Sequence, residues 1–132
     1  MSLHLNILNP TTKNDAVQAA RNLGNLLAET PEYTEYIAAL KALNGDLKIQ
    51  KLSAEMRDHQ AALKWGNDTE GQHTAELTRL ELEMQDQPLV QEFQQRENKL
   101  RTLLQEVDRV ISQEAGVDFA VNAHRRGCAC GG

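Results

Sequence analysis

Two cysteines stand close together near the end of the sequence, in Cys128-Ala129-Cys130, and two glycines follow them. They are the only cysteines in the chain. Thiolates are nucleophiles and metal ligands, and the neighbouring Arg125 and Arg126 favour the thiolate form electrostatically. A disulfide between cysteines two positions apart would close a very small, strained loop, so we do not expect a structural disulfide.

Metal or cluster binding by these thiols would need more ligands than one chain brings. An iron-sulfur cluster or a structural zinc usually has four ligands. We therefore expect Cys128 and Cys130 to bind such a group when a second subunit completes the set, 2 × 2 = 4, or when a partner protein does so. His124 is a further candidate ligand from the same chain. Two other interpretations stay open: a thiol-redox or redox-sensing role of the Cys-X-Cys tail, and a tail without chemistry.

Histidines elsewhere in the chain form weaker patterns. His59 falls on an apolar helical stripe, where a histidine is more often hydrogen-bonded at the edge of the core or at a dimer seam than bound to a metal. His73 lies in a polar stretch and His4 near the N-terminus, so both are predicted to be surface residues.

Acidic residues cluster at Glu76, Glu81 and Glu83, as general acid catalysis or metal binding would require. On a helix, however, positions 76 and 83 share a side and Glu81 is turned away, so a solvated helix face is predicted. Trp65, the only tryptophan, is interpreted either as a partner anchor or as a cover of the core. No Ser-His-Asp set, phosphate loop or dinucleotide fingerprint is present, and we expect no enzyme activity.

The composition of the 132 residues favours one helical domain, with 40% hydrophobic and only 4% aromatic residues. The net charge of −5 gives no polycationic surface, so direct nucleic-acid binding is not expected. There is no 18-residue apolar run, and "LHLNIL" near the N-terminus is short and lacks a basic leader. We therefore predict neither a membrane span nor a signal peptide, and a cytoplasmic location.

Prolines and glycines divide the chain into helices. Pro31 and Pro88 each follow a polar cap candidate, Thr30 and Asp86 or Gln87, and Gly116 ends the last long helix. The pattern predicts helices over 14–28, 31–43, 47–65, 69–85 and 88–115. The predicted fold is all-α, an elongated antiparallel helical hairpin or bundle of about five helices. The predicted organisation is one domain over 1–116 and a tail over 117–132.

The long helices carry apolar stripes that one chain with few aromatic residues cannot fully cover. The stripe of the segment 88–115 is close to a heptad seam. Its members are Phe93, Leu100, Leu103, Leu104, Val107, Val110 and Ile111. We therefore expect a homodimer or an assembly with related subunits, formed through the long amphipathic helices. A monomeric bundle is the alternative.

Three segments in a fixed order resemble the YlbF/YmcA family of small helical bacterial regulators. They are "LGNLLAETPEYTEYIAALKAL" at 23–43, "QKLSAEMRDHQ" at 50–60 and "QPLVQEFQQRENKLRTLLQEVDRVISQEAG" at 87–116. The resemblance covers roughly residues 15–116. Gly66 and Gly71 at the central turn depart from the family pattern, which leaves the shape of that turn open.

The resemblance implies an all-helical, dimerising protein without a catalytic site. Members of the family are regulators of competence, biofilm formation and sporulation that assemble with related subunits and a further partner. That assembly is associated with iron-sulfur clusters and with the ribonuclease that initiates messenger turnover. Cys128 and Cys130 are the residues of this chain that match the cluster-linked feature.

Overall fold

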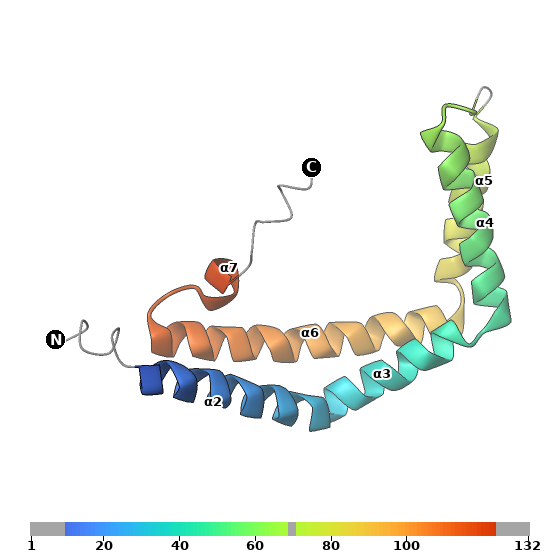
Figure 1. Cartoon of the computed structure of the whole chain (residues 1–132). Coiled ribbons are helices and arrows are strands. Elements are labelled where there is room, and N and C mark those ends of the chain that lie inside the picture. The colour runs from blue at the N-terminus through green and yellow to red at the C-terminus, as the bar shows by residue number, and fades with distance from the viewer. Residues whose placement is uncertain (1–9, 69–70, 124–132) are drawn as a thin grey trace.

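The computed structural model describes residues 10–68 and 71–123 (Figure 1). Every regular element in this part of the chain is a helix, so the all-α prediction is confirmed. The helices are α2 (Pro10–Glu29), α3 (Pro31–Asn44), α4 (Leu47–Lys64), α5 (Gln72–Gln85), α6 (Pro88–Ala115) and α7 (Phe119–Ala123).

Side-chain capping explains where α3 and α4 begin, whereas Gln87, the residue before α6, makes no side-chain capping hydrogen bond. The Thr30 side chain accepts a hydrogen bond from the backbone N–H of Tyr33, and Pro31 occupies the first turn of α3. The Asp46 carboxylate accepts from the N–H of Ile49 at 3.0 Å and caps α4. At the other end of a helix, Gly116 takes φ +76, the left-handed conformation that favours glycine, and ends α6.

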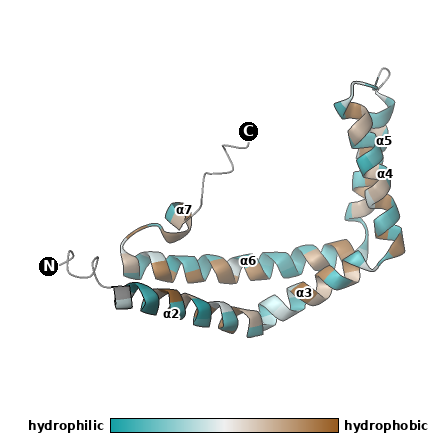
Figure 2. Ribbon diagram, viewed as in Figure 1, coloured by the Kyte–Doolittle hydropathy of each residue, from teal (hydrophilic) through white to brown (hydrophobic). Residues whose placement is uncertain are grey.

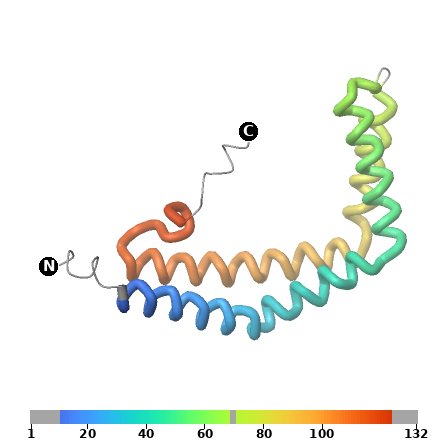
Figure 3. The backbone as a smooth tube through the Cα atoms, viewed as in Figure 1, coloured from blue at the N-terminus to red at the C-terminus, as the bar shows by residue number. Residues whose placement is uncertain are grey.

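The chain forms two arms that meet at a corner, and the molecule is elongated (Figure 1). In the long arm, α2 and α3 follow one another along α6, which runs in the opposite direction (Figure 3). The bend between α2 and α3 falls at Thr30–Pro31, because Thr30 has an extended backbone that interrupts the helix. In the short arm, α4 and α5 lie side by side and point away from the long arm.

The buried core is small and lies at the corner. Among the described residues, the buried apolar side chains come from the parts of α3, α4, α5 and α6 that adjoin the corner. They are Ala39, Ile49, Leu52, Leu80 and Val90. Leu80 is the most deeply buried, with 1% of its surface exposed. Along the outer part of the long arm, apolar and polar residues share the surface of α2 and α6 (Figure 2).

The helix bounds differ from the predicted ones mainly at three places. α2 begins at Pro10 instead of 14, because this proline opens a helix as the other two do. The predicted start of α5 at 69 lies outside the described residues, and the described helix begins at Gln72, after Gly71 with φ +71. α7 adds a sixth helix within the segment 117–132 that was predicted to be a tail.

Candidate functional site

An apolar groove runs between α2 and α6 at the outer end of the long arm, and we call it the α2–α6 groove. Its volume is about 700 Å³. Its lining residues are Ala16, Ala19, Ala20, Leu23 and Leu27 of α2, Leu104, Val107, Asp108, Ile111 and Ala115 of α6, and Phe119 and Ala120 of α7. Among the described residues of this lining Asp108 is the one polar residue, so they offer an almost wholly apolar surface.

The lining side chains are accessible from solution. Leu104 and Phe119 are each 44% exposed, and Leu23, Leu27 and Val107 are half-buried. The α2 side of the groove is built largely from alanines, which allow another helix to approach closely. The α2–α6 groove is therefore shaped for an apolar helical surface more than for a small polar substrate.

The last described helix, α7, closes one end of the groove. The backbone N–H of Phe119 donates to the Ser112 hydroxyl at 2.8 Å, and the N–H of Ala120 donates to the Asp108 carboxylate at 3.0 Å. Because both acceptors belong to α6, they fix the first turn of α7 against it. The sequence pattern predicted the apolar stripe of α6, which forms one wall of the groove, but missed the α7 wall.

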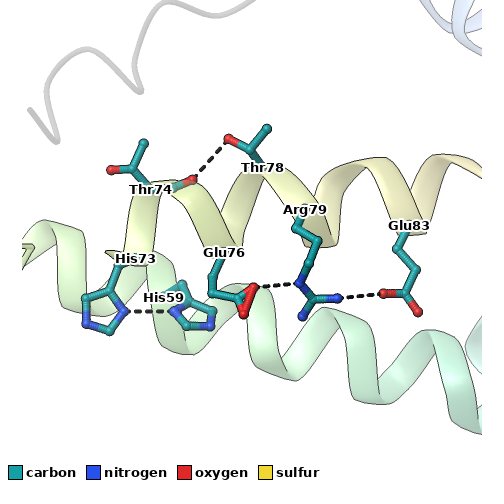
Figure 4. A network of polar contacts seen from close by, with 7 residues as sticks. All are labelled: His59, His73, Thr74, Glu76, Thr78, Arg79 and Glu83. Carbon is teal, nitrogen blue, oxygen red and sulfur yellow. Dashed lines mark hydrogen bonds and ion pairs between the residues drawn. The ribbon is translucent and has the colours of Figure 1, made fainter. Parts of the chain in front are cut away.

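A second cluster of polar side chains lies on the short arm, where α4 and α5 face each other (Figure 4). The Nδ1 atoms of His59 and His73 are 2.8 Å apart, so one nitrogen donates a hydrogen bond and the other accepts it. Next to them, Arg79 donates to Glu76 at 2.6 Å and to Glu83 at 3.2 Å. The network thus joins the two helices of the arm and continues along α5.

Two carboxylates beside the histidines are held in their ionised form. The Thr74 hydroxyl donates to Asp68 and lowers the pKa of that carboxyl, and the His73 backbone N–H and ring lower the same pKa further. The Arg79 guanidinium beside Glu76 lowers the pKa of Glu76, and the nearby His59 adds to the effect. Two carboxylates therefore lie near the histidine pair, and Arg79 pairs with one of them.

Several sequence predictions can be compared with these positions. His59 is half-buried and hydrogen-bonded, as expected. The prediction for His73 is wrong, because it is half-buried against His59 and is not a simple surface residue. Glu76 and Glu83 do share a side of α5, since both contact Arg79, and Glu81 is exposed. Trp65 is 76% exposed, so its interpretation as a cover of the core is wrong.

The predicted ligands Cys128, Cys130 and His124 all lie outside the described residues. Within residues 10–68 and 71–123, no group of three or more His, Cys, Asp or Glu side chains is placed to hold a metal ion. In the same part of the chain, no helix is both long and apolar enough to cross a membrane.

The fold and the groove define an all-helical protein with an accessible apolar face on its longest helices. The chain belongs to the YlbF/YmcA family, because the family model described as "Control of competence regulator ComK, YlbF/YmcA" matches residues 16–114. The family was therefore identified correctly from the sequence. The match includes α3, α4, α5 and most of α2 and α6.

A curated relative agrees with this assignment. The chain is 30% identical over 108 residues to the uncharacterized protein YmcA of Bacillus subtilis (strain 168). The alignment covers 78% of this chain and 76% of the relative. The family description connects its members with the control of competence, which makes a regulatory role the coarse functional assignment for this chain.

Proposed function

We propose that this chain is a non-enzymatic regulatory adaptor of the cytoplasm that acts by assembling with a second helical subunit. The subunit is another copy of the chain or a related family member. The observation that carries the proposal is the α2–α6 groove, which is lined by apolar side chains and has a volume of about 700 Å³ on the outer half of the long arm. Apolar surfaces of this kind on soluble proteins mark interaction sites.

The weak burial of α2 supports the same proposal. None of its side chains described in the structure is buried, and Leu23 and Leu27 are only half-buried. A helix gains most of its stability from packing an apolar face against other elements, because the propensity of its residues alone is marginal. A second subunit seated on the groove would bury this face and stabilise α2.

The cysteine tail extends the proposal to a shared metal site. Cys128 follows the last described residue, Ala123, by five positions, so it lies within about 18 Å of chain from α7. Since α7 forms a wall of the groove, assembly through the groove would bring two tails near each other. We propose that Cys128 and Cys130 of two subunits, with His124 as an added ligand, hold an iron-sulfur cluster or zinc.

The family resemblance supplies the biological setting of this proposal. We propose that the assembly includes a further regulatory protein, and that the ribonuclease that initiates messenger turnover is its target. The assembly then tunes RNA processing without contacting nucleic acid itself. A filled tail site would stabilise the assembly by mass action, because the metal binds the assembled form.

Anaerobic co-purification tests this function. The wild-type chain is isolated from its native host without oxygen, its partners are identified, and metal and sulfide are measured. We expect family subunits or the ribonuclease together with metal, and we expect the metal to be lost in the Cys128→Ser, Cys130→Ser variant. A metal-free preparation whose thiols oxidise reversibly would instead support the alternative, a thiol-redox or redox-sensing protein.

A further inference from the structure

His59 and His73 present ring nitrogens of the same kind to each other from two different helices. Their Nδ1 atoms are 2.8 Å apart and their ring centroids 5.1 Å apart, with the ring planes tilted by 49°. Both residues are half-buried, so each remains partly accessible to solvent. Figure 4 shows the two rings facing each other between α4 and α5.

A single hydrogen between the two Nδ1 atoms is enough to form this hydrogen bond. One Nδ1 carries the hydrogen and the other offers its lone pair, since a neutral imidazole has one donor and one acceptor nitrogen. If both rings carry their hydrogen on Nε2, two lone pairs are directed into the same small space. A cation that accepts both lone pairs can then replace the shared proton.

The spacing is close to that of two nitrogens on one metal ion. With zinc-nitrogen distances of about 2.0–2.1 Å, two ligands of a tetrahedral ion are about 3.4 Å apart. The pair therefore has to widen by roughly 0.6 Å, which small side-chain rotations achieve in a half-buried site. Imidazole nitrogen suits zinc, nickel and copper, whereas magnesium and calcium prefer oxygen ligands.

The charges around the pair favour a cation. The carboxylate of Asp68 contacts the residue His73, and the carboxylate of Glu76 lies beside the His59 ring (Figure 4). The positive charge of Arg79 is shared between Glu76 and Glu83. Asp68 also accepts a hydrogen bond at 2.7 Å from the backbone N–H of His73, and this contact fixes the residue that carries the second ring.

We propose that His59 and His73 bind a divalent transition-metal ion of the zinc class, which joins α4 to α5 near the end of the short arm. Each Nδ1 donates one lone pair to the metal ion. The ring that donated the hydrogen bond between the two Nδ1 atoms then carries its hydrogen on Nε2 instead. Binding therefore releases no proton from the neutral pair and one proton from a singly protonated pair. Within the described residues no third His, Cys, Asp or Glu completes a metal site, so water fills the remaining positions.

The test is a zinc titration of the full chain by calorimetry. The parent protein carries Cys128→Ser, Cys130→Ser and His124→Ala, so that the tail cannot bind the metal. We expect one zinc per chain, and we expect His59→Ala or His73→Ala to weaken binding at least tenfold. His4→Ala is the matched control and should leave the affinity unchanged. With Cu²⁺ as the probe, electron paramagnetic resonance should detect two nitrogen ligands in the parent and one in each single variant.

Two results would overturn the proposal. The first is a parent protein without saturable binding at millimolar zinc. The second is binding of equal affinity in the parent and in both histidine variants. Circular dichroism checks that the variants fold, and His59→Gln or His73→Gln replaces any alanine variant that does not, because glutamine keeps hydrogen-bonding capacity but is a poor zinc ligand. The outcome is independent of subunit assembly through the α2–α6 groove.

Discussion

The backbone N–H of Ala120 donates to the carboxylate of Asp108 at 3.0 Å, and this contact attaches α7 to α6. Ser112 supports it from one turn further along α6, since its hydroxyl donates to Asp108 at 3.3 Å and accepts from Phe119. Asp108 is thus the residue that positions the α7 wall of the groove.

Asp108→Ala should release α7 from α6. The variant removes the acceptor for the Ala120 N–H, and loss of a capping contact typically costs about 1 kcal/mol. We expect the amides of residues 119–123 to exchange with deuterium about fivefold faster, while exchange in α3 stays unchanged. Glu114→Ala, an exposed carboxylate on the same helix, is the control. Unchanged exchange in the Asp108 variant would show that other contacts hold α7.

Leu80→Ala should destabilise the whole molecule. Leu80 is 1% exposed and lies in the small core at the corner, where the cavity left by a truncated leucine costs about 3 kcal/mol. Leu82→Ala is the matched control, because Leu82 lies on the same helix and is 64% exposed; its change should stay within about 0.5 kcal/mol. Urea denaturation followed by circular dichroism measures both values. Equal losses of unfolding free energy in the two variants would contradict the placement of Leu80 in the core.

Acid should weaken the short arm. The folded chain holds the pKa of Asp68 below 3.8 and that of Glu76 below 4.5, so both carboxylates favour folding when they are ionised. Their contribution is fully present above those values and is lost as the pH falls through the lower folded pKa values. The free energy of unfolding should therefore decrease below about pH 4.5.

Removing the carboxylates of Asp68 and Glu76 should make the free energy of unfolding less dependent on pH in acid. The Asp68→Asn, Glu76→Gln double variant is expected to show a smaller decrease in unfolding free energy between about pH 5 and about pH 2. Glu81→Gln, on the other side of α5, is the control and should follow the wild-type profile. If the double variant lost as much stability in acid as the wild type, the claim that Asp68 and Glu76 cause this loss would be wrong.

Arg96 should couple α3 to α6. Its guanidinium donates to Glu35 of α3 at 2.9 Å and to Glu92 of its own helix at 2.8 Å. Arg96→Ala should lower stability slightly at low salt, and the difference from the wild type should shrink at about 1 M salt because mobile ions screen exposed pairs. A double-mutant cycle with Glu35→Ala measures the coupling. Arg101→Ala, whose partners lie on α6 itself, should not couple to Glu35.

The bounds of a helix could be predicted from the sequence where residues at the ends of that helix determine them. The segment 88–115 was predicted with the observed bounds of α6, because Pro88 and Gly116 mark its two ends. α7 was missed because a five-residue helix gains little from its own sequence. Its first turn depends on Ser112 and Asp108, which lie seven and twelve positions before their hydrogen-bond partners and belong to another helix.

The candidate sites were less accessible to sequence reasoning. The apolar stripe of α6 was predicted, but the pattern could not show that a groove lies between it and α2. The contact between His59 and His73 was missed, although one signal was present. Both residues are seven positions from Gly66, so two antiparallel helices joined at that turn bring them opposite each other.

Static light scattering of the purified chain at micromolar concentration tests the central claim, assembly through the α2–α6 groove, most directly. We predict a mass of twice 14.8 kDa for the wild type. Leu104→Asp places a charge in the groove, so its mass should fall to that of one chain. Leu82→Asp places a charge on an exposed part of α5, so its mass should stay at that of two chains. Two results would contradict assembly through the groove. One is a single-chain mass for the wild type both alone and with a co-expressed family member, and the other is a doubled mass for Leu104→Asp.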